Sequence, residues 1–438
     1  MVGQSRVRLV AVAVGVGVIV VVSAHVVGRI YQDPTIWALA GWSVTPDFSV
    51  FYGSAHEVLA GRTPYQDHSF PYGLGYVYPP LLAFVLTPLS ILPFSVATSL
   101  WALLSMFFVV GSLYLLGVRD WRCYPVALLW PFNREALEFG AIDPLLLLVV
   151  AACWRYRDHP WRGSASAGCA VALKLFLWPL ALWLAFTGRI RTAGLAVVSA
   201  CALIFVPWAL IGFQGLVQYP SLLRIASEQK DRTYSLVALA HSLGFSGTLA
   251  YAISLACGLA LLALAFLATR DAASTAGVRD RRSLALLIAA SLVLTPIVWT
   301  HYFVLLLVPV ALARPRLSFV WIFPLLGSAL YAFAWYRPSP EGDLLPLIAV
   351  LTVASVVFAV CLWPRDLGAV VTWARERTWA RAAGGGMVRL GRRRVTTSVA
   401  AAVFVLAMLF AVLPETLGDR PYDPRPSTWP ALRNVELR

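Results

Sequence analysis

A few side chains that can carry or transfer charge stand in or beside long apolar stretches, where a charge is costly. Asp47 follows Pro46 and precedes an apolar and aromatic stretch. A carboxylate at that position could act as a general base that removes a proton from a hydroxyl group. The same residue could also cap a helix, because Asp accepts hydrogen bonds from backbone N–H groups, and the two roles are compatible. Glu57 would lie about 80° away around a shared helix, so we interpret it as a solvated or structural residue.

Two basic side chains lie inside apolar runs. Lys174 occurs in AGCAVALKLFLWPL and has no acidic residue near it in the sequence. This lysine could snorkel to the membrane surface, or it could bind an anion at the outer face. His301 stands at a break between two short apolar segments, next to Pro296 and Trp299. It could be a hydrogen-bonded packing residue or a functional group.

Other charged groups gather in two segments that we expect on the outer side of a membrane. The first is a short turn with Asn133, Arg134, Glu135, Glu138 and Asp143. An internal network of arginine and glutamate and a contact with substrate are both open interpretations of this turn. The second segment carries Arg224, Lys230 and Arg232. A phosphate group near the bilayer surface is the natural partner for such cations.

The familiar motifs of soluble enzymes are missing from the sequence. It contains no GxxxxGK[ST], HExxH or GxSxG motif, and no GxGxxG that follows a strand. These motifs carry nucleotide binding, zinc hydrolysis and serine nucleophiles. The 6 cysteines lie in or beside apolar runs and form neither a CxxC pair nor a Cys/His cluster. We therefore expect a reaction that needs no metal and no cofactor.

The elements that position these residues are predicted to be membrane helices. Of the 438 residues 60% are hydrophobic and 13% are charged, whereas soluble domains carry about 25% charged residues. The apolar residues fall in runs of roughly 20, the length that crosses a hydrocarbon core. The sequence predicts an all-α, polytopic membrane protein with about thirteen transmembrane helices, several of them short and paired. They are expected near 7–30, 95–117, 123–133, 142–155, 164–175, 176–187, 192–212, 247–270, 283–298, 301–313, 317–336, 344–363 and 396–413.

The distribution of charge predicts the orientation of the chain. Basic loops flank the run 164–187 on both sides, so we interpret it as a hairpin of two short legs rather than one crossing. The N-terminus and the loops that this places in the cytoplasm carry a net charge of +17, and the other face carries −4. Lys174 between them completes the formal net charge of +14. The positive charge is therefore a topology signal, and we expect no nucleic-acid partner.

Four regions follow from this map. We expect residues 1–363 to form a transmembrane domain that holds the candidate catalytic residues, 364–394 a basic cytoplasmic loop, 395–414 the last membrane helix and 415–438 an outer polar tail. The first helix has a basic start but is too long for a signal peptide, so we expect it to be retained. The basic loop could bind anionic lipid headgroups. The outer segments 31–94 and 213–246 combine prolines with apolar runs, which predicts interfacial helices.

Five stretches, in order along the chain, resemble glycosyltransferase family 87, within the C superfamily of polytopic glycosyltransferases. They read TPDFSVFYGSAHEVLAGRTPYQ, YVYPPLLAFVLTPLSILP, AGCAVALKLFLWP, RTYSLVALAHSL and LTPIVWTHYFVLLLVP. Two positions depart from the family pattern. The chain reads Gly140-Ala141-Ile142-Asp143 where members commonly read Gly-Gln-x-Asn. Phe48 replaces the Leu of the phosphatidylinositol mannoside branch, so the sequence does not assign the chain to that branch.

The resemblance implies an actinobacterial enzyme that moves a sugar from polyprenyl phosphate to a lipid-anchored or polysaccharide acceptor. Asp47 would be the general base of an inverting displacement. Candidates for balancing the charge on the donor phosphate are Lys174, His301 and Arg232. Candidates for contacts with the acceptor or the sugar are Tyr78, Arg134, Asp143 and Tyr302. Mannose is the expected sugar, with arabinofuranose as the other possibility.

The resemblance also implies a location and leaves one rival function open. The enzyme would sit in the bacterial plasma membrane, in contact with membrane lipids, with its N-terminus in the cytoplasm and its active site facing the periplasm. A polytopic transporter or flippase would also carry many helices and a few buried charges. Transporters usually show repeated halves, whereas the polar candidates here gather on one predicted face. That asymmetry favours an enzyme.

Overall fold

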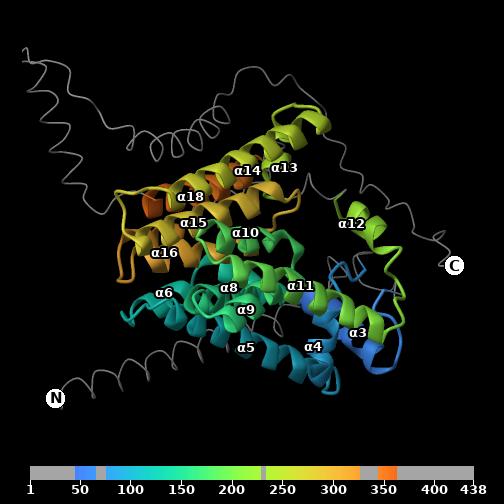
Figure 1. Cartoon of the computed structure of the whole chain (residues 1–438). Coiled ribbons are helices and arrows are strands. Elements are labelled where there is room, and N and C mark those ends of the chain that lie inside the picture. Colours follow the sequence, from blue (N-terminus) through green and yellow to red (C-terminus); the bar gives the residue numbers. More distant parts are fainter. Residues whose placement is uncertain (1–44, 66–74, 228–232, 326–343, 363–438) are drawn as a thin grey trace, which may run out of the picture.

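The computed structural model describes residues 45–65, 75–227, 233–325 and 344–362, which form helices and contain no strand (Figure 1). The predicted helices at 7–30 and 396–413 lie outside the described residues. So do the basic loop 364–394, the tail 415–438 and Arg232. The all-α class is confirmed for the described part of the chain.

One set of helices follows the apolar runs of the sequence. They are α5 (Phe94–Leu115), α8 (Asp143–Tyr156), α9 (Pro160–Leu173), α10 (Pro179–Phe186), α11 (Ile190–Leu210), α14 (Gly247–Thr269), α15 (Ala276–Leu294), α16 (Leu307–Ala313) and α18 (Leu344–Leu362). The other described helices lie between them or before them: α3 (Pro46–Leu59), α4 (Leu81–Ser90), α6 (Cys123–Leu128), α7 (Pro131–Phe139), η1 (Leu175–Leu177), α12 (Tyr219–Ser227), α13 (Leu236–Ser242) and η3 (Thr300–Leu306). In Figure 1, α14, α15 and α18 lie side by side, and α3 and α4 pack together at the far end of the bundle.

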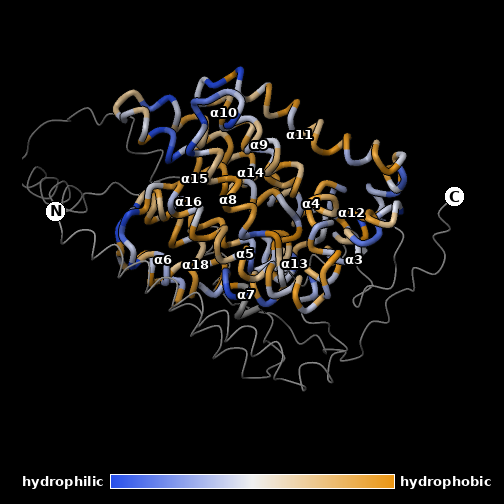
Figure 2. The backbone as a smooth tube through the Cα atoms, turned by 90° about the horizontal axis from the view of Figure 1, so that it is seen from below, coloured by the Kyte–Doolittle hydropathy of each residue, from blue (hydrophilic) through white to orange (hydrophobic). Residues whose placement is uncertain are grey.

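Three described helices, α5, α11 and α14, are long and apolar enough to cross a membrane. Apolar residues line almost all the helices, and hydrophilic residues gather mainly in the connections (Figure 2). Large apolar side chains such as Val198 and Phe205 on α11 and Leu255 on α14 are exposed on the outside of the bundle. Such a surface suits lipid rather than water. The protein is therefore a helical membrane protein, and the number of crossings stays a prediction.

Helices α9 and α10 form the two legs of the predicted hairpin. Nε of Arg157, before α9, lies 3.0 Å from Oδ2 of Asp280, and Nη2 of Arg189, after α10, lies 2.8 Å from the same oxygen. Both ends of the run 160–187 therefore meet at one carboxylate. Lys174 lies at the break between the legs, with extended backbone angles of φ −154° and ψ 105°. This is the geometry that the hairpin interpretation predicts.

Small residues let α9 approach α11 closely. A Cβ at Gly168 would lie 2.5 Å from Cβ of Ser199, so a larger residue would push the helices apart. Ala196 and Ala200 of α11 are buried on the same side. Small residues at helix contacts are typical of membrane proteins, where close backbone packing drives helix association. The packing sets the position of the C-terminal end of α9, and with it Lys174.

The first outer segment begins with α3. Its N-cap is Thr45, which makes no capping hydrogen bond through its side chain, and Asp47 lies inside the first turn. The interpretation of Asp47 as the cap was therefore wrong, because the helix begins at Pro46 rather than after Asp47. Glu57, near the other end, accepts a 2.9 Å hydrogen bond from Nη2 of Arg62, as expected of a structural residue.

Tyrosine hydroxyls hold the chain between α3 and α4. Tyr65 donates to the carbonyl of Tyr78 at 2.9 Å, and Tyr76 donates to that of Pro79 at 2.8 Å. Tyr219 of α12 reaches across to the carbonyl of Val77 at 3.1 Å. These bonds fix the irregular backbone before α4, because each gives a hydrogen-bond donor to a backbone carbonyl that lies outside a helix.

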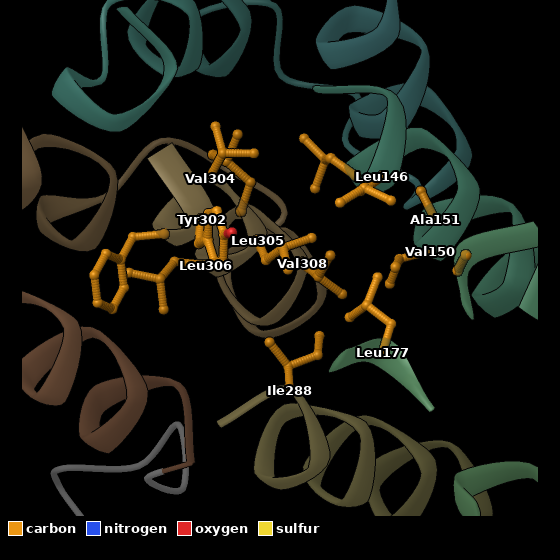
Figure 3. Packing of buried hydrophobic residues seen from close by; sticks show 14 of the residues in the cluster. Leu146, Val150, Ala151, Leu177, Ile288, Tyr302, Val304, Leu305, Leu306 and Val308 are labelled. Carbon is orange, nitrogen blue, oxygen red and sulfur yellow. The ribbon is translucent and has the colours of Figure 1, made fainter. Parts of the chain in front are cut away.

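The core of the bundle surrounds η3 and α16. Val304, Leu305 and Leu306 are fully buried. Figure 3 shows their neighbours, contributed by α8, η1 and α15. The labelled neighbours are Leu146, Val150, Ala151, Leu177 and Ile288. The 3₁₀ segment interrupts the run from α15 to α16, and such interruptions often mark functional positions.

Candidate active site

Four ionisable side chains from distant parts of the sequence meet in one cluster. Both carboxylate oxygens of Asp143 lie 3.2 Å from Nζ of Lys174. Nε2 of His301 lies 3.6 Å from Oδ2 of Asp143 and 3.9 Å from Oδ2 of Asp47. We call these four residues the tip cluster, because Lys174 lies at the tip of the α9–α10 hairpin. In this arrangement each of the two carboxylates, the ammonium and the imidazole lies within 3.9 Å of another charged or ionisable group of the cluster.

The pair of Asp143 and Lys174 is buried. The Asp143 side chain is 0% exposed and that of Lys174 is 8% exposed. Asp143 begins α8, where the helix dipole stabilises a negative charge. Lys174 follows the last residue of α9, where the break frees its side chain to leave the helix. A buried charge without a partner costs several kcal/mol, so each of these groups needs the other.

Aromatic rings surround the lysine ammonium. Nζ lies 3.4 Å from the ring centroid of Tyr302, 5.8 Å from that of Phe176 and 5.9 Å from that of Tyr78. Phe176 and Tyr302 stack on each other with centroids 5.4 Å apart. Ring faces attract cations, which partly replaces the lost hydration of the ammonium. Lys174 is thus held inside the protein and does not snorkel.

His301 occupies the break between α15 and α16, as predicted. Its ring is buried and lies against Phe139 of α7, with centroids 5.9 Å apart. Nε2 faces the two carboxylates, and the buried Nδ1 has no hydrogen-bond partner among the described residues. The backbone before His301 is tied to another predicted stretch, because the Tyr234 amide donates to the carbonyl of Val298 at 2.6 Å.

Asp47 reaches the cluster from α3 and is its accessible member, with a side chain 30% exposed. Burial raises the pKa of Asp47 to about 7, the nearby Lys174 lowers it in part and Asp143 raises it. α3 is not one of the candidate membrane-spanning helices. A carboxyl group that titrates near neutral pH can accept a proton in a reaction and release it afterwards.

A tight turn brings α3 to α8. Gly140 ends α7 with φ +66°, and a Cβ there would lie 2.5 Å from Cβ of Phe48. The indole of Trp101 donates to the Gly140 carbonyl at 2.8 Å and stacks on Phe48 with centroids 5.7 Å apart. Glycine permits both the positive φ and the close approach. The turn therefore sets Asp47 and Asp143 on the same side of the bundle.

Helix α7 presents a carboxylate that the sequence analysis placed in the charged turn but did not choose as a candidate site residue. The predicted candidate Arg134 is exposed and pairs with Glu138 at 3.0 Å, away from the tip cluster. Glu135 is half-buried on the face that packs against η3. Burial is the main reason that its pKa is raised to about 7; a side-chain hydrogen bond with Thr300 of η3 works against the rise, and the charge of Glu138 adds to it. Helical spacing could have indicated this position, because Glu135 lies three residues after Phe132 and four before Phe139 and so shares a helix face with them.

The structure thus brings together most of the predicted site residues. The tip cluster and its aromatic contacts contain Asp47, Tyr78, Asp143, Lys174, His301 and Tyr302. Arg134 is exposed on α7 and pairs with Glu138 instead. Arg232 lies outside the described residues, although the neighbouring Thr233 donates to the carbonyl of Pro296 at 3.4 Å.

Known proteins that resemble the chain are mannosyltransferases. One relative is the polyprenol-phosphate-mannose-dependent alpha-(1-2)-phosphatidylinositol pentamannoside mannosyltransferase of Mycolicibacterium smegmatis. The chain is 30% identical to it over 270 residues, and this match covers 56% of the chain and 62% of the relative. The protein of the same name from Mycobacterium tuberculosis is 28% identical over 261 residues, or 55% of this chain and 58% of the relative. The chain thus matches less than two thirds of the length of these relatives. No solved structure matches it.

A family model matches the middle of the chain. The model of glycosyltransferase family 87 matches residues 76–298, about half of the chain. The match includes Asp143 and Lys174, whereas Asp47 precedes it and His301 follows it. The tip cluster therefore joins residues inside the matched region to residues on both sides of it. The chain belongs to glycosyltransferase family 87.

Proposed function

We propose that this protein is a mannosyltransferase that takes mannose from polyprenyl phosphate and transfers it to a hydroxyl group of a cell-envelope lipid or glycan. The observation that carries the proposal is the meeting of Asp47, Lys174 and His301 in a chain that belongs to glycosyltransferase family 87. The donor is supported by the named dependence of the relatives on polyprenol-phosphate-mannose.

In this proposal Asp47 is the general base. The acceptor oxygen attacks the anomeric carbon of the sugar while the bond from that carbon to the phosphate oxygen breaks, and its electron pair leaves with the phosphate. Asp47 takes the proton of the acceptor hydroxyl. The partial exposure of its side chain supports this role, because an acceptor could reach it. One base and one displacement invert the configuration of the anomeric carbon.

The departing phosphate needs positive charge more than it needs an acid, because a phosphate ester is a weak base. Lys174 supplies a full positive charge, and His301 supplies a buried imidazole whose Nδ1 has no partner among the described residues. Electrostatic stabilisation of developing charge is commonly the largest contribution to catalysis. Arg232 remains a third candidate.

Tyr78, Tyr302 and Glu135 are candidates for contacts with the sugar or the acceptor. Both tyrosine rings face the Lys174 ammonium, and Glu135 lies on the α7 face towards η3. A phosphatidylinositol mannoside is the first acceptor to test, because the relatives bear that acceptor in their names. We place the enzyme in the plasma membrane with this site facing the periplasm, on the strength of the charge asymmetry of its loops.

The test uses the full-length protein in lipid nanodiscs. Radiolabelled polyprenyl-phosphate-mannose is supplied with phosphatidylinositol mannosides, and polyprenyl-phosphate-arabinofuranose is supplied in a parallel reaction. We expect a mannosylated lipid of inverted configuration from the first donor only. Transfer of arabinofuranose alone would contradict the assigned sugar. Movement of either donor across the bilayer without transfer would favour a flippase.

A further inference from the structure

Asp143 is the best-connected member of the tip cluster. Its two oxygens each lie 3.2 Å from Nζ of Lys174, and Oδ2 also lies 3.6 Å from Nε2 of His301. The side chain is 0% exposed. The lysine that we assign to the donor phosphate thus already holds an anion of this chain, and a second candidate phosphate ligand faces the same anion.

The ammonium of Lys174 has little capacity left for a second anion. An ammonium has three N–H donors. Two contacts go to Asp143, and the ring of Tyr302 lies 3.4 Å from Nζ at its centroid. A phosphate oxygen could therefore bind the ammonium only by displacing a carboxylate oxygen or the ring. Displacing a carboxylate oxygen brings a second anion to the same ammonium, so the donor phosphate must bind against the charge of Asp143.

We infer that Asp143 is an internal competitor of the donor phosphate for Lys174, an inference that rests on the proposed function. Without donor, Asp143 holds the ammonium. When the phosphate binds, Asp143 gives up at least one of these hydrogen bonds and keeps its contact with His301. Asp143 is a positioning residue in this scheme, because it acts on the substrate through Lys174.

Charge explains what such a competitor does for turnover. The donor phosphodiester carries one negative charge, whereas the released phosphate monoester carries nearly two at neutral pH. A buried ammonium without a counter-ion would hold that product tightly. The return of the Asp143 carboxylate to Lys174 offsets this attraction and speeds release. Both binding of donor and release of product thus depend on how strongly Asp143 holds the lysine.

The test measures the inhibition constant of polyprenyl phosphate and the donor KM for the wild type and for Asp143→Asn, both full length in nanodiscs. We expect Asp143→Asn to bind polyprenyl phosphate about tenfold more tightly, since a competing charge a few ångströms from the ammonium is removed. The donor KM should fall as well, and kcat should fall because product leaves slowly. A purely structural ion pair predicts the opposite, an unchanged or weaker affinity.

Two further variants keep the test decisive. Asp143→Asn with Lys174→Met removes both charges, so it should recover thermal stability and lose the gain in affinity. Should Asp143→Asn fail to fold, Asp143→Glu retains the charge but displaces the carboxylate from its bidentate position. It should bind polyprenyl phosphate a few-fold more tightly than the wild type.

The outcomes separate this inference from the proposed function. A folded Asp143→Asn or Asp143→Glu with unchanged or weaker affinity for polyprenyl phosphate would overturn the role of Asp143, while transfer by the wild type would stand. Failure of the wild type both to bind polyprenyl phosphate and to transfer mannose would overturn the proposed function itself.

Discussion

The α9–α10 hairpin carries an ionic cluster at each end, and the two differ in construction. The tip cluster joins Lys174 to Asp143 at 3.2 Å and holds His301 at 3.6 and 3.9 Å from two carboxylates. At the other end lies a base cluster of Arg157, Asp158, Arg189 and Asp280. Its pairs of Arg189 with Asp158 and Asp280 and of Arg157 with Asp280 are 2.7–3.0 Å long, and the pair of Arg157 with Asp158 is 3.9 Å long. Two guanidinium groups lie 2.8 and 3.0 Å from a single oxygen of Asp280.

The difference indicates two roles. In the base cluster, the guanidinium of Arg157 also lies 4.0 Å from the ring centroid of Trp154, so it is held by a carboxylate and by an aromatic ring. Charged groups in such short contacts rigidify the fold. The tip cluster has no contact shorter than 3.2 Å, and its Asp47 is accessible. Each cluster also holds one buried nitrogen that has no hydrogen-bond partner in the described part of the chain, Nδ1 of His301 and Nη1 of Arg189. We interpret the base cluster as a structural contact that holds the two ends of the hairpin together. We interpret the tip cluster as a site whose remaining contacts are made by the substrate.

The largest difference should appear when Asp47 is replaced. Asp47→Asn removes the base and keeps the size of the side chain, so kcat should fall by about 10²–10⁴-fold. The measurement is transfer of radiolabelled mannose by the variant in nanodiscs. Glu57→Gln is the matched control, since Glu57 lies on the same helix and pairs with Arg62. Equal activity of the two variants would contradict the assignment of the base.

The base cluster should instead respond in stability. Asp280→Asn leaves two arginines, whose side chains are 21% and 18% exposed, without their shared carboxylate. Breaking a buried pair typically costs 3–5 kcal/mol, so about 2 kcal/mol is expected for this partly buried one. Asp158 pairs with the same Arg189 at 2.7 Å but is 71% exposed. Asp158→Asn should therefore cost less than about 1 kcal/mol. Thermal unfolding in detergent compares them.

The pH dependence of activity offers a third contrast. Asp47 must be ionised to accept a proton, and its pKa is raised to about 7. The kcat/KM should therefore rise about tenfold per pH unit up to about pH 7 and then level off. Asp280→Asn should leave this rise of kcat/KM with pH unchanged, because the cluster around Asp280 takes no part in proton transfer. A rise that shifts to another pH in Asp280→Asn, or that is centred near pH 4 in the wild type, would contradict the role of Asp47.

Individual members of the tip cluster were predictable, whereas their pairing was not. Asp47, Lys174 and His301 stand out in the sequence because a charge in an apolar run is costly. The pair of Lys174 and Asp143 joins residues 31 positions apart. Only the placement of the α8 N-terminus beside the hairpin break reveals it. The sequence therefore showed Asp143 only as a difference from the family pattern in a charged turn. It could not identify Asp143 as the partner of the lysine.

The helix positions and the hairpin were predictable for a different reason. Apolar runs mark helices, and arginines on both flanks of 164–187 mark a segment that returns to the side where it began. The face of a short helix is harder to predict, because it depends on which neighbour the helix packs against. Arg134 and Glu135 are adjacent in the sequence, and only contact with η3 shows that Glu135 faces inwards.

The smallest expected effect follows from that contact. Glu135→Gln removes a half-buried carboxylate whose pKa is raised to about 7, mainly by burial and against the effect of its hydrogen bond with Thr300. If Glu135 binds an acceptor hydroxyl, the acceptor KM should rise a few-fold, because Gln keeps a neutral hydrogen-bond acceptor and loses only the added strength of a charged one. The donor KM should not change, because Lys174 and His301 remain.

Glu138→Gln is the matched control for this last variant. Glu138 lies on the same helix and pairs with the exposed Arg134 at 3.0 Å. Steady-state kinetics with the acceptor varied at saturating donor separate the two glutamates. A larger effect from Glu138→Gln, or an equal change in both KM values for Glu135→Gln, would move the acceptor away from the inner face of α7. An effect confined to the acceptor KM of Glu135→Gln would extend the substrate-binding region from the tip cluster to α7, while the base cluster stayed purely structural.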